Sequence, residues 1–126
     1  MNNNFNKETL ITLSGVSSDK EKYGHKIFRD LINSNYDVVG VNPKGGTILE
    51  QEIYSSLEEV PRKTQLLIVV VPPKIGIQVV REAKKLGIEN VWLQPGAQSD
   101  EIVQYAKANN INLIYNRCFM TDQGIW

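Results

Sequence analysis

The fold of this chain is indicated most clearly by one stretch, Val38-Val39-Gly40-Val41-Asn42-Pro43-Lys44-Gly45-Gly46. Its first four residues are typical of a buried strand, and the strand ends at a loop containing an amide, a rigid proline, a cation and two glycines. In doubly wound α/β folds the loop after the second strand selects the ligand, and an acid at this position hydrogen-bonds the ribose hydroxyls of NAD. Asn42 and Lys44 stand here instead, which suits a phosphate better than a free diol.

The rest of the chain alternates apolar runs with helical patterns. Strands are predicted at 9–14, 37–41, 65–71, 90–93 and 111–115, and helices at about 23–33, 75–86 and 100–106. The run at 65–71 is continuously apolar, which is typical of a strand buried on both faces of a parallel sheet. Strands and helices that alternate, with right-handed crossovers, predict an α/β fold. We therefore expect one Rossmann-like domain over residues 1–126, built on a single doubly wound parallel sheet.

The spacing of apolar residues predicts which helix faces point to the core. These are Ile27, Phe28, Leu31 and Ile32 on the first helix, Ile75, Val79, Ala83 and Leu86 on the second, and Ile102, Val103 and Ala106 on the third. Ser99 is expected to cap the third helix. Serine followed three residues later by glutamate, twice within 55–59, predicts a capping box and one short helical turn.

Composition excludes several classes of protein. Fourteen basic and fourteen acidic residues cancel, so neither nucleic acid nor an anionic membrane is an expected partner. Residues 1–7 are polar and unlike a signal peptide, and the longest apolar run, 66–73, is too short to span a bilayer. One cysteine excludes an internal disulfide and a multi-cysteine metal cluster. We expect a soluble cytoplasmic protein.

Candidate ligand contacts lie in the loops that follow the predicted strands, because ligands of doubly wound sheets bind beyond the carboxyl ends of the strands. They are Gly15, Val16, Ser17 and Ser18 after the first strand, Asn42, Pro43 and Lys44 after the second, Pro72 and Pro73 after the third, and Gln94, Pro95 and Gly96 after the fourth. Gly15 is not followed by further glycines at dinucleotide-binding spacing. For each loop, an ordinary turn without a ligand is the alternative interpretation.

Few residues could catalyse a reaction. His25 is the only histidine and is expected on a helix face beside Gly24, with a phosphate contact as the alternative. Cys118 is expected to be a small buried side chain, with a mixed disulfide to a thiol ligand as the alternative. Because no triad, paired-acid or metal-site pattern occurs, we predict no catalytic and no metal-binding residues.

Several motifs, in this order and spacing, resemble the small bacterial CoA-binding proteins, whose domain is similar to the CoA-binding domain of the succinyl-CoA synthetase α subunit. They are Gly15-x-Ser17, Tyr23-Gly24, Val41-Asn42-Pro43-Lys44, Tyr54-x-Ser56-Leu57-x-x-Val60-Pro61, Pro72, Val91-Trp92-Leu93-Gln94-Pro95-Gly96 and Asn116-Arg117-Cys118. Together they span about residues 10–118. The resemblance implies a Rossmann-like fold that binds coenzyme A, or an acyl-CoA, without chemistry of its own.

The resemblance also implies roles for the candidate residues. The loop from Gly15 to Ser18, together with Asn42, Pro43 and Lys44, would hold the nucleotide and its phosphates, and Tyr23 and Gly24 would open the first helix beside it. Pro72 and Pro73 would flank the adenine or the pantetheine, and Gln94 to Gly96 would line the far side. The synthetase also needs a domain with a phosphorylated histidine and a nucleotide-binding subunit, so we expect a CoA-binding chain that forms a homodimer or joins an enzyme partner.

Two other functions are compatible with the sequence. In the first, the chain is an NAD(P)-binding oxidoreductase or a redox-sensing nucleotide-binding protein, and Lys44 accepts a 2′-phosphate. The missing glycine fingerprint, substrate domain and acid–base residue argue against an oxidoreductase. In the second, the chain is an interaction subunit whose ligand pocket is vestigial.

Overall fold

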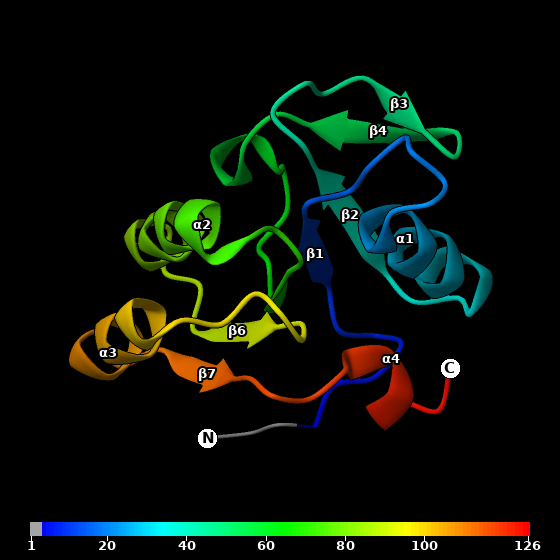
Figure 1. Cartoon of the computed structure of the whole chain (residues 1–126). Helices are drawn as coiled ribbons and strands as arrows, with labels where there is room; N and C mark the ends of the chain where they lie inside the picture. The colour runs from blue at the N-terminus through cyan, green and yellow to red at the C-terminus, as the bar shows by residue number, and fades with distance from the viewer. Residues whose placement is uncertain (1–3) are drawn as a thin grey trace.

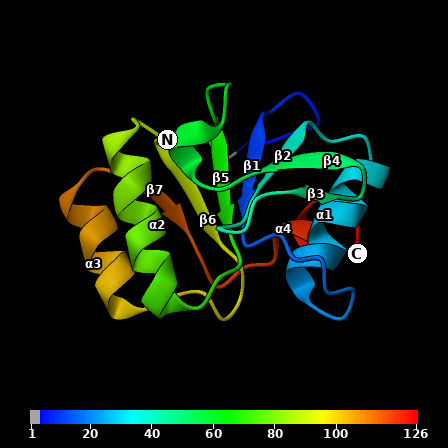
Figure 2. The same cartoon turned by 90° about the horizontal axis from the view of Figure 1, so that it is seen from above.

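A seven-stranded sheet separates two helical layers in the computed structural model, which describes residues 4–126 (Figure 1). The strands are β1 (Ile11–Ser14), β2 (Val38–Val41), β3 (Thr47–Ile48), β4 (Gln51–Tyr54), β5 (Leu66–Val69), β6 (Asn90–Leu93) and β7 (Asn112–Ile114). The helices are α1 (Tyr23–Asn33), α2 (Pro73–Lys85), α3 (Asp100–Ala108) and α4 (Phe119–Asp122), with a 3₁₀ turn, η1 (Leu57–Glu59). Figure 2 shows α2 and α3 on one side of the sheet and α1 and α4 on the other.

Strand β1 occupies the centre of the sheet, whose order is β3-β4-β2-β1-β5-β6-β7. It pairs in parallel with β2 on one side and with β5 on the other, so that Ile11 lies opposite both Val38 and Leu66. Only the pairing of β3 with β4 is antiparallel among the described strands. The predicted doubly wound α/β fold is therefore confirmed, and its strand order changes direction at β1.

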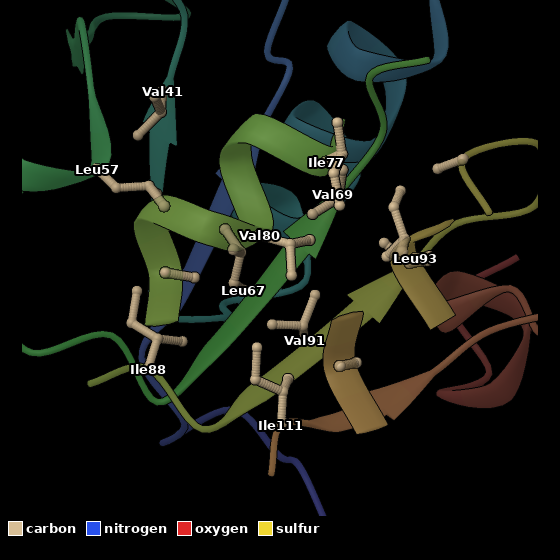
Figure 3. Close-up of a cluster of buried hydrophobic side chains, with 14 residues drawn as sticks. Val41, Leu57, Leu67, Val69, Ile77, Val80, Ile88, Val91, Leu93 and Ile111 are labelled. Carbon is tan, nitrogen blue, oxygen red and sulfur yellow. The ribbon is translucent and has the colours of Figure 1, made fainter. Parts of the chain in front are cut away.

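Strand β5, which lies in the apolar run 65–71, is buried on both of its faces. Leu67 and Val69 on β5 belong to the cluster under α2 and α3 (Figure 3), whereas Leu66 and Ile68 belong to the cluster under α1 and α4. All four side chains have no exposed surface. Because alternate residues of a strand point to opposite faces, both layers need apolar residues from β5, and the polar positions of a half-exposed strand are absent.

The ends of the helices follow the local signals in the sequence. Helix α1 covers the predicted range 23–33, and Asn35 after it adopts a positive φ of 63°, a conformation that asparagine tolerates better than most residues. The Ser99 hydroxyl accepts a hydrogen bond of 3.2 Å from the Ile102 amide, which confirms the predicted cap of α3. Within residues 4–126, none of the helices combines the length and apolar character needed to cross a bilayer.

The predicted inward face of α2 is wrong by part of a turn. Ile75 and Leu86 are 52% and 42% exposed, while Gly76, Ile77 and Val80 are buried against the sheet and α3, as is the predicted Ala83. Both sets of residues satisfy a helical period. On the observed face, Gly76 faces the Ile102 side chain of α3, so contact with α3 decides between the two sets.

Three local features differ from the expectations. The hairpin of β3 and β4 and the short helix α4 were not predicted. The short turn is present as η1, but Ser56 at its start makes no side-chain cap, and the Glu59 carboxylate instead accepts hydrogen bonds from the amide and hydroxyl of Ser55. The serine–glutamate pair is thus four residues apart rather than three.

Candidate ligand site at the carboxyl edge of the sheet

A cavity of about 460 Å³ lies at the carboxyl end of β1, where the strand order changes direction. It is lined by Gly15, Val16, Ser17, Glu21, Lys22, Tyr23, Gly24, Asn42, Pro43, Val70, Val71 and Pro72. The first, second and third strand-end loops of the sequence analysis meet here with the start of α1. We call this space the loop cavity. Its volume lies within the range of about 300–1,000 Å³ that is usual for small-molecule sites.

Two glycines bring the β1 loop and α1 into direct contact. A Cβ on Gly24 would lie 2.0 Å from the carbonyl oxygen of Gly15, which no side chain can occupy. Gly15 has a φ of +113°, and a Cβ there would lie 2.5 Å from a methyl carbon of Val70. The N-terminus of α1 consequently packs on the loop itself, which leaves its first N–H groups near the cavity.

His25 contacts the same loop from the interior of the protein. Its side chain is only 5% exposed, and Nδ1 lies 2.9 Å from the carbonyl oxygen of Ser17. Because a carbonyl can only accept, Nδ1 carries the proton. The Ser17 hydroxyl in turn accepts a 3.0 Å hydrogen bond from the Asp19 amide. His25 therefore lies on the inner face of α1, as the first of its two interpretations expects, and holds the loop in place.

Asn42 joins the second strand-end loop to the first. Its Nδ2 donates to the carbonyl oxygen of Val16 at 2.6 Å, and its Oδ1 accepts from the Lys44 amide at 2.8 Å. The amide of Gly45 donates to the Asn42 carbonyl at 2.8 Å, which closes a β-turn with Pro43 at its second position. The side chain of Asn42 thus fixes the relative position of two walls of the loop cavity.

Lys44 lies outside the loop cavity. It lines a separate hollow of about 560 Å³ with Gly45, Tyr54, Ser55 and Glu59, on the side of the β3–β4 hairpin. Ser18 is exposed and lines neither this hollow nor the loop cavity, and Pro73 forms the first turn of α2. The structure therefore brings eight of the fourteen candidate residues together around the loop cavity, and these three lie outside it, as does the loop from Gln94 to Gly96.

Gln94 and Pro95 line a second, smaller cavity of about 250 Å³. Its other walls are Tyr23, Ile27, Val70, Cys118 and Trp126, and we call it the inner cavity. Gln94 is 6% exposed; its Oε1 accepts from the Phe119 amide at 2.8 Å and its Nε2 donates to Cys118 Sγ at 3.6 Å. Gly96 takes a positive φ of 95° and turns the chain away towards α3. Tyr23 and Val70 line both cavities, which are therefore neighbours.

The thiol of Cys118 is half-buried at the wall of the inner cavity. Burial raises the pKa of this thiol, but hydrogen bonds from Thr121, Gln94 and the Met120 amide outweigh burial and hold the pKa below its usual value. Cys118 is therefore only partly buried, rather than the buried small side chain expected from the sequence, because the thiol keeps contact with the cavity. Among residues 4–126, no group of three or more His, Cys, Asp or Glu side chains is placed to hold a metal ion.

Trp126 is a wall residue that the sequence analysis did not identify. Its Nε1 donates to Asp30 Oδ2 at 2.7 Å, and its ring centroid lies 6.1 Å from that of Tyr23. The adjacent Arg29 guanidinium and the indole N–H hold the pKa of the Asp30 carboxyl below its usual value against the effect of burial. A tryptophan far from every predicted strand end gives no sequence signal for a site, because only the packing of residues 119–126 on α1 brings it there.

A family model described as a CoA binding domain matches residues 9–123. The chain belongs to this family of CoA-binding domains. The family named from the sequence motifs is thereby confirmed, and so is its Rossmann-like fold. The solved structure of a conserved hypothetical protein from Pyrococcus furiosus, 36% identical, superposes with a TM-score of 0.87 and is matched over 90% of this chain and 98% of that one.

Curated relatives of this CoA-binding domain are much longer proteins. ADP-forming acetate–CoA ligase I from Archaeoglobus fulgidus is 26% identical over 119 residues, which cover 86% of this chain and 17% of the ligase. The α subunit of ADP-forming acetate–CoA ligase I from Pyrococcus furiosus is 31% identical over 93 residues, 69% of this chain and 20% of the subunit. The chain thus spans about a fifth of the length of these relatives. All three proteins named here are archaeal, so the bacterial origin implied by the resemblance stays a prediction.

Proposed function

We propose that this chain binds coenzyme A, or an acyl-CoA, at the carboxyl edge of its sheet and does not itself catalyse a reaction. The observation that carries the proposal is the loop cavity, which lies where the strand order changes direction in a chain of the CoA-binding domain family. This is the position at which open α/β sheets bind nucleotides. Because Gly24 has no Cβ, the start of α1 lies against the Gly15 carbonyl, and this brings the Ser17 and Gly24 amides close together, where they can donate to a bound phosphate.

The nucleotide half of the ligand occupies the loop cavity in this proposal. Ser17 holds the phosphates with the first turn of α1, and Lys22 supplies a cation at the same wall. Gly15 and Val16 line the cavity beside them, but their amides already donate to the Val41 carbonyl. Pro43 and Pro72 are the apolar surfaces against which the adenine or the pantetheine packs. Tyr23, Gln94 and Pro95 follow on the side of the inner cavity. Ser18, Lys44, Pro73 and Gly96 stand at the margins and contact outlying groups of the ligand.

A binding role for these residues is supported by the part of the ligases that they match. The matched segment makes up 17% and 20% of the two ligase chains, and His25 is bonded to the Ser17 carbonyl in the interior. We propose that the chain works in the cytoplasm beside an enzyme partner that supplies the chemistry, or as a homodimer. Light scattering during size-exclusion chromatography distinguishes a monomer from a homodimer.

Isothermal titration tests the ligand. We expect one molecule of CoA to bind per chain, with weaker binding of ADP because it lacks the pantetheine arm. Substitution Gly24→Ala is expected to abolish binding, since its Cβ would collide with the Gly15 carbonyl and displace the loop. Binding of NADPH without binding of CoA would overturn the proposal in favour of a dinucleotide-binding protein.

Lys44 is predicted to contact the 3′-phosphate of CoA from the margin of the site. Lys44→Ala should weaken CoA binding about fivefold, as expected for one exposed charge–phosphate contact, and leave dephospho-CoA binding unchanged. Lys85→Ala, which removes an exposed lysine in the last turn of α2, is the matched control and should change neither. Equal affinity of the Lys44→Ala variant and the unaltered protein for CoA would exclude this role.

A further inference from the structure

The inner cavity shares wall residues with the loop cavity, but it is smaller and its lining is largely apolar. Tyr23 and Val70 are shared walls, so a ligand that leaves the loop cavity along them enters the inner cavity. The rest of the lining is largely apolar, with the Gln94 amide and the Cys118 thiol as its polar groups. A volume of about 250 Å³ is below that of a usual small-molecule site and suits the end of a ligand rather than a whole one.

The outer wall of the inner cavity is a fixed aromatic side chain. Trp126 is 45% exposed, yet three contacts hold it: Nε1 donates to Asp30 at 2.7 Å, the backbone amide donates to the Met120 carbonyl at 3.2 Å, and the ring packs beside Tyr23. Because the hydrogen bond to Asp30 has an ionised acceptor, it is stronger than a bond between neutral groups. The indole therefore limits the space in the cavity.

We propose that the inner cavity receives the thiol end of coenzyme A with a short acyl group, and that Trp126 limits the length of the acyl chain. This inference rests on the proposed function. Coenzyme A carries its nucleotide at one end and its thiol at the other end of the pantetheine arm. With the nucleotide in the loop cavity, the arm passes Tyr23 and Val70, and its sulfur comes to lie near Gln94 and Cys118.

The alternative exit for the arm is less suitable. The hollow beside Lys44 has a polar lining that includes Glu52 and Glu59, so it offers carboxylates where an acyl chain needs apolar contacts. The inner cavity instead offers Ile27, Val70 and two aromatic rings. An acyl chain too long for the inner cavity has to displace the Trp126 ring and break its hydrogen bond with Asp30, which opposes binding of long chains.

The test compares ligands that differ only in the acyl group. Titration calorimetry of the unaltered protein is expected to give similar affinities for CoA and acetyl-CoA and a roughly tenfold weaker affinity for octanoyl-CoA. Trp126→Ala should bind octanoyl-CoA at least as well as acetyl-CoA, because the obstructing ring is gone. Trp126→Phe should keep most of the discrimination, since it retains a ring. Leu86→Ala, which shortens an exposed apolar residue after α2, should behave like the unaltered protein.

The variant Asp30→Ala tests the same wall without removing the Trp126 side chain, in case Trp126→Ala does not fold. Asp30→Ala keeps the indole and removes its acceptor, and its discrimination should fall between those of the unaltered protein and Trp126→Ala. If CoA binds and Trp126→Ala discriminates between acetyl-CoA and octanoyl-CoA as the unaltered protein does, the inference is overturned and the proposed function stands. If the unaltered protein binds neither CoA nor any acyl-CoA, the proposed function itself fails.

Discussion

Asn42 and Gln94 each follow a strand, and the side-chain amide of each fixes the position of one chain segment relative to another. Asn42 bonds the Val16 carbonyl and the Lys44 amide with its two polar atoms, and Gln94 bonds Cys118 and the Phe119 amide in the same way. An amide has two donors and two acceptor lone pairs, so each side chain keeps capacity for a ligand. These residues therefore shape the walls of the two cavities even before any ligand binds.

Cys118 is predicted to react as a more acidic thiol than an ordinary cysteine. Because its folded-state pKa is lowered, the thiolate forms at a lower pH than in the unfolded chain. The rate of alkylation by iodoacetamide should rise with pH and reach its midpoint at a lower pH than for an ordinary cysteine. The same protein unfolded in urea should show a higher midpoint.

Thr121 supplies the largest of the contributions that lower this pKa. Thr121→Val keeps the shape of the side chain and removes its hydroxyl, so the midpoint should move to higher pH. Cys118→Ser should abolish the reaction, since the chain has one cysteine. A midpoint that is the same in the folded and unfolded protein would contradict the prediction.

The elements of this fold were predictable to the extent that local signals decided them. Helix α1 and the cap of α3 follow from apolar spacing and from Ser99, but the β3–β4 hairpin lacks its usual signal. Its two-residue turn, Leu49-Glu50, has positive φ at both positions, where asparagine and glycine are the common residues. The inward face of α2 was missed for a different reason, because two apolar stripes share one period and only contact with α3 decides between them.

Gly76 in α2 offers a test of that helix–helix contact. A Cβ at this position would lie 3.4 Å from Ile102 Cδ1, an ordinary packing distance, and alanine favours a helix more than glycine does. Gly76→Ala should therefore increase the free energy of unfolding by about 0.5–1 kcal/mol, measured by urea denaturation. Gly24→Ala is the contrasting variant and should lower it by about 1–3 kcal/mol, because its Cβ meets a backbone carbonyl. A loss of stability in Gly76→Ala would contradict this prediction and show that α2 and α3 leave no space for a Cβ between them.

Across the whole molecule, the sheet topology assembles a site from loops that are far apart in the sequence. The strand-end rule placed the loops after β1, β2 and β5 around one cavity, which is why most of the candidate residues could be named without coordinates. The turn at Pro43 carries the chain towards the β3–β4 hairpin, so Lys44 lies in the neighbouring hollow rather than in this cavity. The strand-end rule could not find Trp126, whose place depends on the packing of the segment after α4 against α1.

Binding of CoA is expected to stabilise the folded chain as a unit, since both cavities are built from several elements. At a free concentration one hundred times the Kd, a ligand that binds only the folded state adds about 2.7 kcal/mol. For a domain of this size that corresponds to a rise in Tm of about 10 °C, measurable by calorimetry. Leu86→Ala should show the same rise, whereas Gly24→Ala should show none. An unchanged Tm at saturating CoA would contradict specific binding to the native state.

The central position of β1 has a consequence for how the chain folds. Its partner β2 follows after a single crossover, but its other partner, β5, lies much further along the chain, and Leu66 of β5 pairs with Ile11. Closing so long a loop is slow, and parallel pairing leaves no hairpin to nucleate it. Until Leu66 emerges from the ribosome, β1 of a nascent chain exposes the edge that later pairs with β5, and an unpaired strand edge of this kind favours aggregation.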